Sequence, residues 1–262
     1  VFVASSASHA IAVFSRDPLT GVLSFVERVA DGLGTIIPDS NVIRGVRRLH
    51  LTADGRHLYA VAPLSSALSR FDVNATSGVL TYRGAQRSGS PGLSALAAAR
   101  DLVGTPGDTF LYALGSGGVV GFERSPDGSL SVVAGGSHAL AGSALPQSLV
   151  LDAFGARVSV ADAAGAVHVF ARDWRTGVLD VRSVFVAPGG VLGKPNELLH
   201  VGASEDLYMT SSQPSAIVQL DELPLSRCLL AAGTQSPIAE DVDIGVDGWA
   251  ALQVDAQVHP SA

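Results

Sequence analysis

The stretch RLHLTADGRHLYAV (residues 48–61) consists of two short runs on either side of an Asp-Gly pair, Asp54-Gly55. Within each run apolar and polar residues alternate, and this period of two is typical of β-strands. Glycine adopts the positive φ that a tight antiparallel turn requires at no steric cost. The stretch therefore predicts a β-hairpin.

The same layout returns along the chain. It recurs in residues 148–173, in residues 197–221 with a degraded turn, and as a first half in residues 242–254. Each complete hairpin leads to an aromatic residue that precedes a glycine-containing turn, and these aromatics are separated by 57, 51 and 48 residues: Phe14, Phe71, Phe122 and Phe170. Self-similarity at a period of about fifty residues indicates a repeat architecture.

Each unit holds four short apolar runs. In the second unit they are RRLHLTA, HLYAVA, ALSRFDV and VLTYRGA, and in the third unit the spacing places SALAAAR (residues 94–100) on the first strand. Sheets of four antiparallel strands bury both faces when they are arranged radially around one axis. We therefore predict an all-β fold, a β-propeller of four-stranded antiparallel blades.

The chain holds about five such blades. We expect one domain, 1–262, with repeat units at residues 1–43, 44–92, 93–144, 145–193 and 194–241 and a partial unit at 242–262. The first unit lacks its first strand and the last lacks its third and fourth, so we expect a segment of a larger, six- to seven-bladed propeller. A five-bladed ring, closed by residues 241–247, is the alternative.

Composition excludes several classes of protein. The chain has 262 residues and a formal net charge of −7, which argues against a nucleic-acid partner because phosphate binding needs a surplus of Lys and Arg. It contains no apolar run of about eighteen residues, so no membrane insertion is expected. The single cysteine, Cys228, excludes an internal disulfide framework and a cysteine zinc cluster. No cofactor is expected.

Two motifs carry a family resemblance. TADGRHLYAV (residues 52–61) resembles the core of the YVTN-type propeller repeat, and F-x-R-D-x-x-T-G-x-L, starting at Phe14 and again at Phe170, is similar to the hairpin that follows it in lactonase-like propellers. The resemblance implies the propeller fold. Six-phosphogluconolactonase-like enzymes contain such repeats, and so do large secreted or surface proteins without known catalysis. The Pro-His pair typical of the enzymes' first inner-strand motifs does not precede any first strand here, which argues against inherited activity.

Polar residues stand where the first strand of each blade begins, a position that a propeller places at the mouth of its central channel. Convergent polar groups there could orient a sugar, a lactone or a peptide side chain. The candidates are Arg47, Arg48, Ser94, Gln147, Asn196, Glu197 and Glu240. The alternative is that strand starts are polar simply because they are exposed.

Three further residues could hold a metal ion. His50 and His200 take equivalent places in the repeat, and Asp243 aligns with them. Two imidazoles and a carboxylate suit a divalent cation. The three residues lie on different blades, however, and equivalent positions often hold a histidine bonded to a neighbouring backbone carbonyl, so we expect no metal.

These features predict a non-catalytic scaffold or protein-interaction module within a larger extracellular or cell-surface protein, bound to a protein partner or to the rest of a longer chain. The sequon Asn74-Ala75-Thr76 lies in an exposed hairpin and predicts glycosylation in that setting. The alternative is a lactonase-like hydrolase acting on a sugar lactone in the central pocket, and carbohydrate recognition is intermediate. The chain has no G-x-S-x-G elbow that would anchor Ser/His/Asp catalysis. Enzymatic activity is thus left open, with the scaffold favoured.

Overall fold

The computed structural model describes residues 1–32, 37, 41–140, 145–186, 194–201, 206–212 and 215–220, together with the backbone of residues 232–233 and 254–255. The chain divides into two compact units. Unit 1 comprises Val1–Leu140 with Arg175–Val178, and unit 2 comprises Ala141–Trp174 with Leu179–Ala262. The prediction of a single domain stays a prediction.

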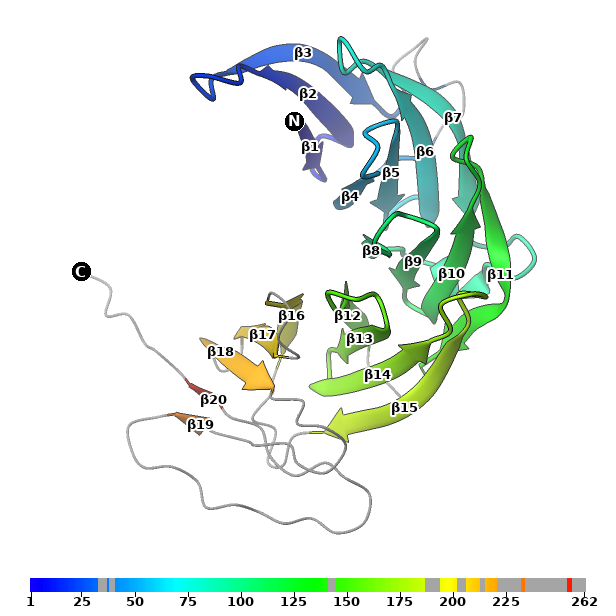
Figure 1. The fold of residues 1–262 in the computed structure, drawn as a ribbon, viewed down its shortest axis with the longest axis vertical. Helices are drawn as coiled ribbons and strands as arrows, with labels where there is room; N and C mark the ends of the chain where they lie inside the picture. The colour runs from blue at the N-terminus through cyan, green and yellow to red at the C-terminus, as the bar shows by residue number, and fades with distance from the viewer. Residues whose placement is uncertain are drawn as a thin grey trace. The chain divides into compact units, whose positions relative to one another are not determined.

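Unit 1 contains three antiparallel sheets, whose strands follow one another in chain order (Figure 1). The first sheet has three strands: β1 (Phe2–Ser5), β2 (Ala10–Arg16) and β3 (Leu23–Ala30). The second has four: β4 (Arg48–Leu51), β5 (His57–Ala62), β6 (Ala67–Val73) and β7 (Leu80–Arg87). The third also has four: β8 (Asp101–Gly104), β9 (Phe110–Gly115), β10 (Gly118–Arg124) and β11 (Leu130–Ala139).

Unit 2 continues the pattern. One sheet has four strands: β12 (Pro146–Leu151), β13 (Arg157–Asp162), β14 (Ala166–Arg172) and β15 (Leu179–Val186). Another has three: β16 (Pro195–His200), β17 (Leu207–Ser212) and β18 (Ser215–Leu220). Two short strands, β19 (Ala232–Gly233) and β20 (Val254–Asp255), pair in parallel. The all-β blade prediction is confirmed, whereas the strand predicted at residues 241–247 lies outside the described residues.

Glycines close the predicted hairpins. Gly55 connects β4 to β5 with φ +69°, and Gly128 connects β10 to β11 with φ +83°. Gly128 is also required by a close approach, because a Cβ atom there would lie 2.5 Å from Nδ1 of His57 in the preceding blade. Turn chemistry and blade packing thus demand the same residue.

The repeat predicted that residues 94–100 form the first strand of the third blade. This prediction is wrong. Ser94–Leu96 forms a 3-10 helix named η1, and the strand is β8, which begins at Asp101. Ala95 and Leu96 are buried, and the backbone of Ala95 comes so close to Gly115 that a side chain there could not fit. Small residues therefore serve helix-to-hairpin packing here rather than strand pairing.

The blades of unit 1 are joined by apolar packing and by tyrosine hydroxyls. Ile11 and Val29 of the first blade share a buried cluster with Leu58 of the second. The fully buried Tyr59 donates its hydroxyl to the Gly128 carbonyl at 2.5 Å, and Tyr112 donates to the Gly177 carbonyl at 2.7 Å. Among the described residues, no helix is long and apolar enough to cross a membrane.

Candidate functional site

Arginines gather where β4 and β8 begin. The Arg47 N–H donates to the Val61 carbonyl, and the Arg100 N–H donates to the Leu114 carbonyl in the equivalent place of the next blade. Arg47 and Arg100 therefore hold the same register position on neighbouring strands. Arg48, one residue further, pairs with Asp101 through an Nε–Oδ1 distance of 2.7 Å.

This cluster carries more positive than negative charge. Burial lowers the pKa of Arg100, and the nearby charge of Arg47 lowers it further. The Asp101 side chain is buried, and the Arg48 side chain with which it pairs is 40% exposed. An anionic group bound between the two blades would reduce the repulsion between Arg47 and Arg100.

A pocket of about 550 Å³ lies beside Arg47. Its lining comes from the turn between β1 and β2, which contributes Ser6 and His9, and from the segments on either side of β4 and β5, which contribute Gly45 and Leu64. The Gly45 N–H donates to His9 Nδ1 at 3.0 Å, which fixes the imidazole at the pocket wall. The pocket is large enough for a sugar-sized ligand.

His50 lies two residues after Arg48 on β4, on the same face of the strand. Its Nε2 atom is 2.6 Å from Oδ1 of Asp108, and its side chain is 21% exposed. The other carboxylate oxygen of Asp108 accepts the Ala53 N–H at 2.6 Å. A buried carboxylate of the third blade therefore orients a partly exposed imidazole of the second.

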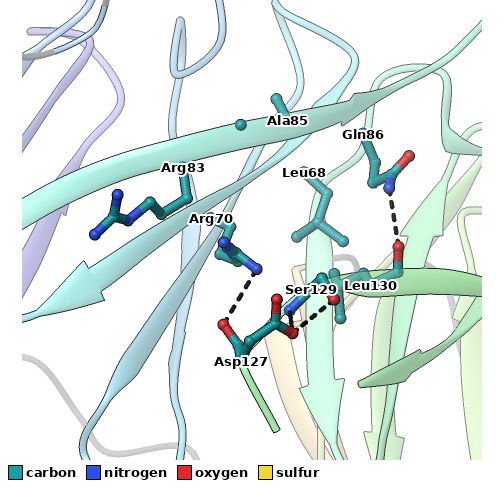
Figure 2. A pocket seen from close by; sticks show the side chains of 9 residues that line it. Leu68, Arg70, Arg83, Ala85, Gln86, Asp127, Ser129 and Leu130 are labelled. Carbon is teal, nitrogen blue, oxygen red and sulfur yellow. Dashed lines mark hydrogen bonds between the residues drawn. The ribbon is translucent and has the colours of Figure 1, made fainter. Parts of the chain in front are cut away.

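A second pocket, of about 290 Å³, lies on the outer strands of unit 1 (Figure 2). Arg70 of β6 donates to the Asp127 carbonyl at 3.3 Å, and Gln86 of β7 donates to the Leu130 carbonyl at 3.1 Å. Arg83, on the same wall, pairs with Asp72 at 2.7 Å. Because these groups already bind protein partners, this pocket is the weaker candidate for a ligand.

The three candidates of unit 2 lie on two strands, β12 and β16. Gln147, in β12, donates its amide to the Leu145 carbonyl at 3.0 Å. Asn196 and Glu197 are exposed in β16, where the Glu197 N–H donates to Thr210 Oγ1 at 3.2 Å. Their predicted convergence with Arg47 and Arg48 stays a prediction.

The predicted equivalence of His50 and His200 is wrong. His50 pairs with Tyr59, whereas His200 pairs with Leu207, which corresponds to Leu58. The degraded turn after β16 hid this offset of one residue, and an offset of one places side chains on opposite faces of a sheet. Burial lowers the pKa of His200.

The described residues contain no group of three His, Cys, Asp or Glu side chains placed to hold a metal ion. Asp243, Glu240 and Cys228 lie outside the described residues. Ser94 is exposed at the start of η1, away from any strand start. Asn74 occupies the predicted exposed turn, where its Oδ1 accepts the N–H groups of Thr76 and Ser77; its glycosylation stays a prediction.

Four residues of this region were missed in the sequence. Arg100 and Asp101 escaped notice because the repeat was aligned through residues 94–100. Asp108 was missed because it stands in the turn where the second blade has Gly55. The sequence did contain a signal. The turn in which the Thr52 N–H donates to the His57 carbonyl has a counterpart in TPGDTF (residues 105–110), and each turn begins with a threonine, so the two could be aligned directly. His9, in a short hairpin turn, gave no signal.

Comparison with known proteins identifies the family. The family model described as "Lactonase, 7-bladed beta-propeller" matches residues 39–192, more than half of the chain. The chain belongs to this lactonase family. The matched segment of the lactonase-family chain includes Arg47, Arg48, His50, Arg100 and Asp108.

Solved structures share the fold of this lactonase-family chain. A candidate 6-phosphogluconolactonase from Bacteroides uniformis is 14% identical, with a TM-score of 0.69, over 85% of this chain and 63% of that one. Another from Bacteroides fragilis is 17% identical, with a TM-score of 0.67, over 97% and 69%. The periplasmic gluconolactonase PpgL of Pseudomonas aeruginosa is 17% identical, with a TM-score of 0.66, over 94% and 66%. This chain thus spans roughly two thirds of their length, and no curated protein matches it by sequence.

The family assignment corrects the functional prediction. The interpretation as a non-catalytic scaffold is wrong, because the family whose model matches this chain is the lactonases. The missing Pro-His pair favoured the wrong interpretation, because it was taken as an argument against inherited activity. The lactonase-like alternative is the better supported interpretation.

Proposed function

We propose that this chain forms part of a hydrolase that opens sugar lactones. The observation that carries the proposal is the arginine cluster at the starts of β4 and β8, inside the segment that matches the lactonase family. One member of the cluster, Arg47, lines a sugar-sized pocket. Guanidinium groups bind carboxylates and phosphates through charge-assisted, often paired hydrogen bonds. The hydroxy acid product of a sugar lactonase presents a carboxylate, and a phosphorylated lactone presents a phosphate as well.

The cluster favours a phosphorylated substrate. Arg47 is exposed next to the pocket, and the positive charges of Arg47 and Arg100 are close enough to repel each other. Two cations at neighbouring strand starts suit a phosphate better than a neutral hydroxyl. The names of the similar structures include both 6-phosphogluconolactonase and gluconolactonase, so both substrates belong in the test.

The reaction requires two functions from the site. Water adds to the carbonyl carbon of the lactone, so negative charge develops on the carbonyl oxygen and must be stabilised. A second group must remove the proton of the attacking water. Arg48 is placed for the first function, because Asp101 holds its guanidinium at the strand start.

The test measures hydrolysis of 6-phosphogluconolactone and of gluconolactone by the purified protein, each corrected for spontaneous opening. The proposal expects acceleration of at least one lactone and a preference for the phosphorylated one. Arg47→Ala should raise KM for the phosphorylated lactone about tenfold, the loss of one charge-assisted bond, and leave that for gluconolactone nearly unchanged. Arg56→Ala, an exposed arginine in the turn at the other end of β4, is the matched control and should change neither. Rates equal to the blank with both lactones would refute the proposal.

An extracellular or cell-surface location belongs to the same proposal. It is supported by the exposed sequon at Asn74, whose turn leaves the residue accessible. A mass decrease of the Asn74 peptide after glycosidase treatment of protein from its natural source tests it.

A further inference from the structure

The blade fold does not require the pair formed by His50 and Asp108. The corresponding positions on β8 and β12 hold Val103, opposite Tyr112, and Val150, opposite Ser159. These blades form the same strands with an apolar residue in that place. An imidazole at residue 50 therefore needs an explanation other than folding.

Asp108 holds the imidazole from a position that disfavours an aspartate. Its φ is +55°, in the region where the equivalent turns have Gly55 and Gly155. Side chains rarely adopt this backbone conformation, and strained residues of this kind gather at functional sites. Asp108 is 4% exposed, and its carboxylate binds both His50 and the Ala53 N–H. The strain is thus retained together with a fixed carboxylate.

Gly104 makes room for the pair. A Cβ atom at this position would lie 2.4 Å from His50 Nε2 and 2.6 Å from Asp108 Oδ1. Gly104 is not among the residues with positive φ, so the backbone conformation does not demand glycine. The glycine is needed because the imidazole and the carboxylate meet directly above it.

The geometry also defines which nitrogen is free. With Nε2 donating to the Asp108 carboxylate, Nδ1 carries the lone pair, and within the described residues it has no hydrogen-bond partner. The other charged groups around the pair are Arg124, which donates to the Asp108 carbonyl at 2.9 Å, and Asp54, 3.6 Å from Arg124. Arg48 lies on the same face of β4, about 7 Å away along the strand.

We propose that His50 is the general base of lactone opening and that Asp108 is its positioning residue; this rests on the proposed function. Nδ1 takes a proton from water as the water oxygen bonds to the lactone carbonyl carbon, and the carbonyl π electrons move to oxygen beside the Arg48 guanidinium. The bond from carbon to the ring oxygen then breaks, the ring oxygen keeps the electron pair, and His50 returns the proton to it. One lactone and one water give one hydroxy acid, which loses its acid proton to solvent.

The kinetic test compares two variants with a matched control. General base catalysis contributes about 10²–10⁴-fold, so His50→Gln should lower kcat by at least about a hundredfold and change KM less than threefold. Asp108→Asn should also lower kcat, because an amide donating to Nε2 would move the ring proton to Nδ1. In His50→Gln, whose side chain cannot take up a proton, the fall of kcat on the acid side of the wild-type pH profile should disappear. His57→Gln, which alters another histidine–aspartate pair in unit 1, should keep the wild-type kcat and profile.

A measurement without substrate separates this inference from the proposed function. Nitrogen-15 NMR of the neutral His50 ring should show a protonated Nε2 and a bare Nδ1, reversed in Asp108→Asn. If the wild type opens lactones and folded His50→Gln retains its kcat, the inference is wrong and the proposed function stands. If the wild type opens no lactone, the proposed function and the assignment of His50 as general base are both wrong, whichever ring nitrogen of His50 is protonated. A protonated Nδ1 in an active wild type would overturn the assignment of His50 as base.

Discussion

Replacing Tyr59 by phenylalanine removes one hydroxyl from the interface between the second and third blades of unit 1. Tyr59 is fully buried, and its hydroxyl donates to the Gly128 carbonyl at 2.5 Å. Phenylalanine keeps the ring packing, so the change isolates this hydrogen bond. Loss of the bond, with the buried carbonyl left without that donor, should cost about 1–3 kcal/mol of unfolding free energy. Each kcal/mol should lower Tm by roughly 2–4 °C in a protein of this size.

The same residue gives the prediction a pH signature. Burial raises the pKa of Tyr59 from its ordinary 10.0 to about 12. The unfolded chain therefore loses this proton first as pH rises, so the stabilisation is complete below pH 10 and is lost between pH 10 and 12. The loss amounts to about 2–3 kcal/mol, from 1.36 kcal/mol for each pKa unit. Phenylalanine cannot titrate, so the difference between wild type and variant should shrink across that range.

Equilibrium unfolding in urea at pH 8 and at pH 11.5, followed by circular dichroism, measures both effects. Tyr208→Phe is the matched control: it stands at the same place in the last described blade, and its hydroxyl makes no hydrogen bond within the described residues. The control should change the free energy by less than about 0.5 kcal/mol. A Tyr59→Phe variant as stable as wild type at pH 8, or a difference that does not shrink by pH 11.5, would refute the reasoning.

Three further predictions follow from the site and the surface. Gly104→Ala places a Cβ atom 2.4 Å from His50 Nε2. The overpacking should lower the free energy of unfolding, measured by chemical denaturation, by about 1–3 kcal/mol and should also lower kcat. An unchanged kcat in this variant would show that the His50–Asp108 pair tolerates displacement. Asp108→Gly introduces the residue that the turn favours, so relief of about 1–2 kcal/mol of backbone strain should offset much of the lost hydrogen bonding. Tm measured by calorimetry should therefore change little while kcat falls. A large drop in Tm would mean that the hydrogen bonds of the Asp108 carboxylate contribute more to stability than the strain costs. Asn74→Gln removes the sequon from an exposed turn, so secreted eukaryotic expression should give a product smaller by one glycan, and equal masses would contradict glycosylation.

The blade architecture could be predicted because its rules are local. Alternating runs and Gly turns specify each hairpin, and HLYAVA and ALSRFDV became β5 and β6 as expected. The insertion before β8 could not be predicted, because Ala95 and Leu96 are buried by contacts with Gly115 and Gly117, which are distant in sequence. Repeat spacing alone cannot distinguish a strand from a packed turn of 3-10 helix.

The site was predicted only in part. Arg47 and Arg48 could be placed at a strand start from the repeat, but the side chains that Arg48 and His50 contact come from the neighbouring blade. Asp101 meets Arg48 and Asp108 meets His50 only through the packing of β8 against β4. The sequence shows which residues stand on each strand, and it does not show which side chains of successive blades meet.

A structure of the protein with a hydrolysis-resistant sugar lactam tests most directly where the lactone binds. The lactam carbonyl should lie beside Arg48, with its carbon one water molecule away from His50 Nδ1. Lactam bound instead between Arg70 and Arg83, in the outer pocket of Figure 2, would contradict the assignment of the site.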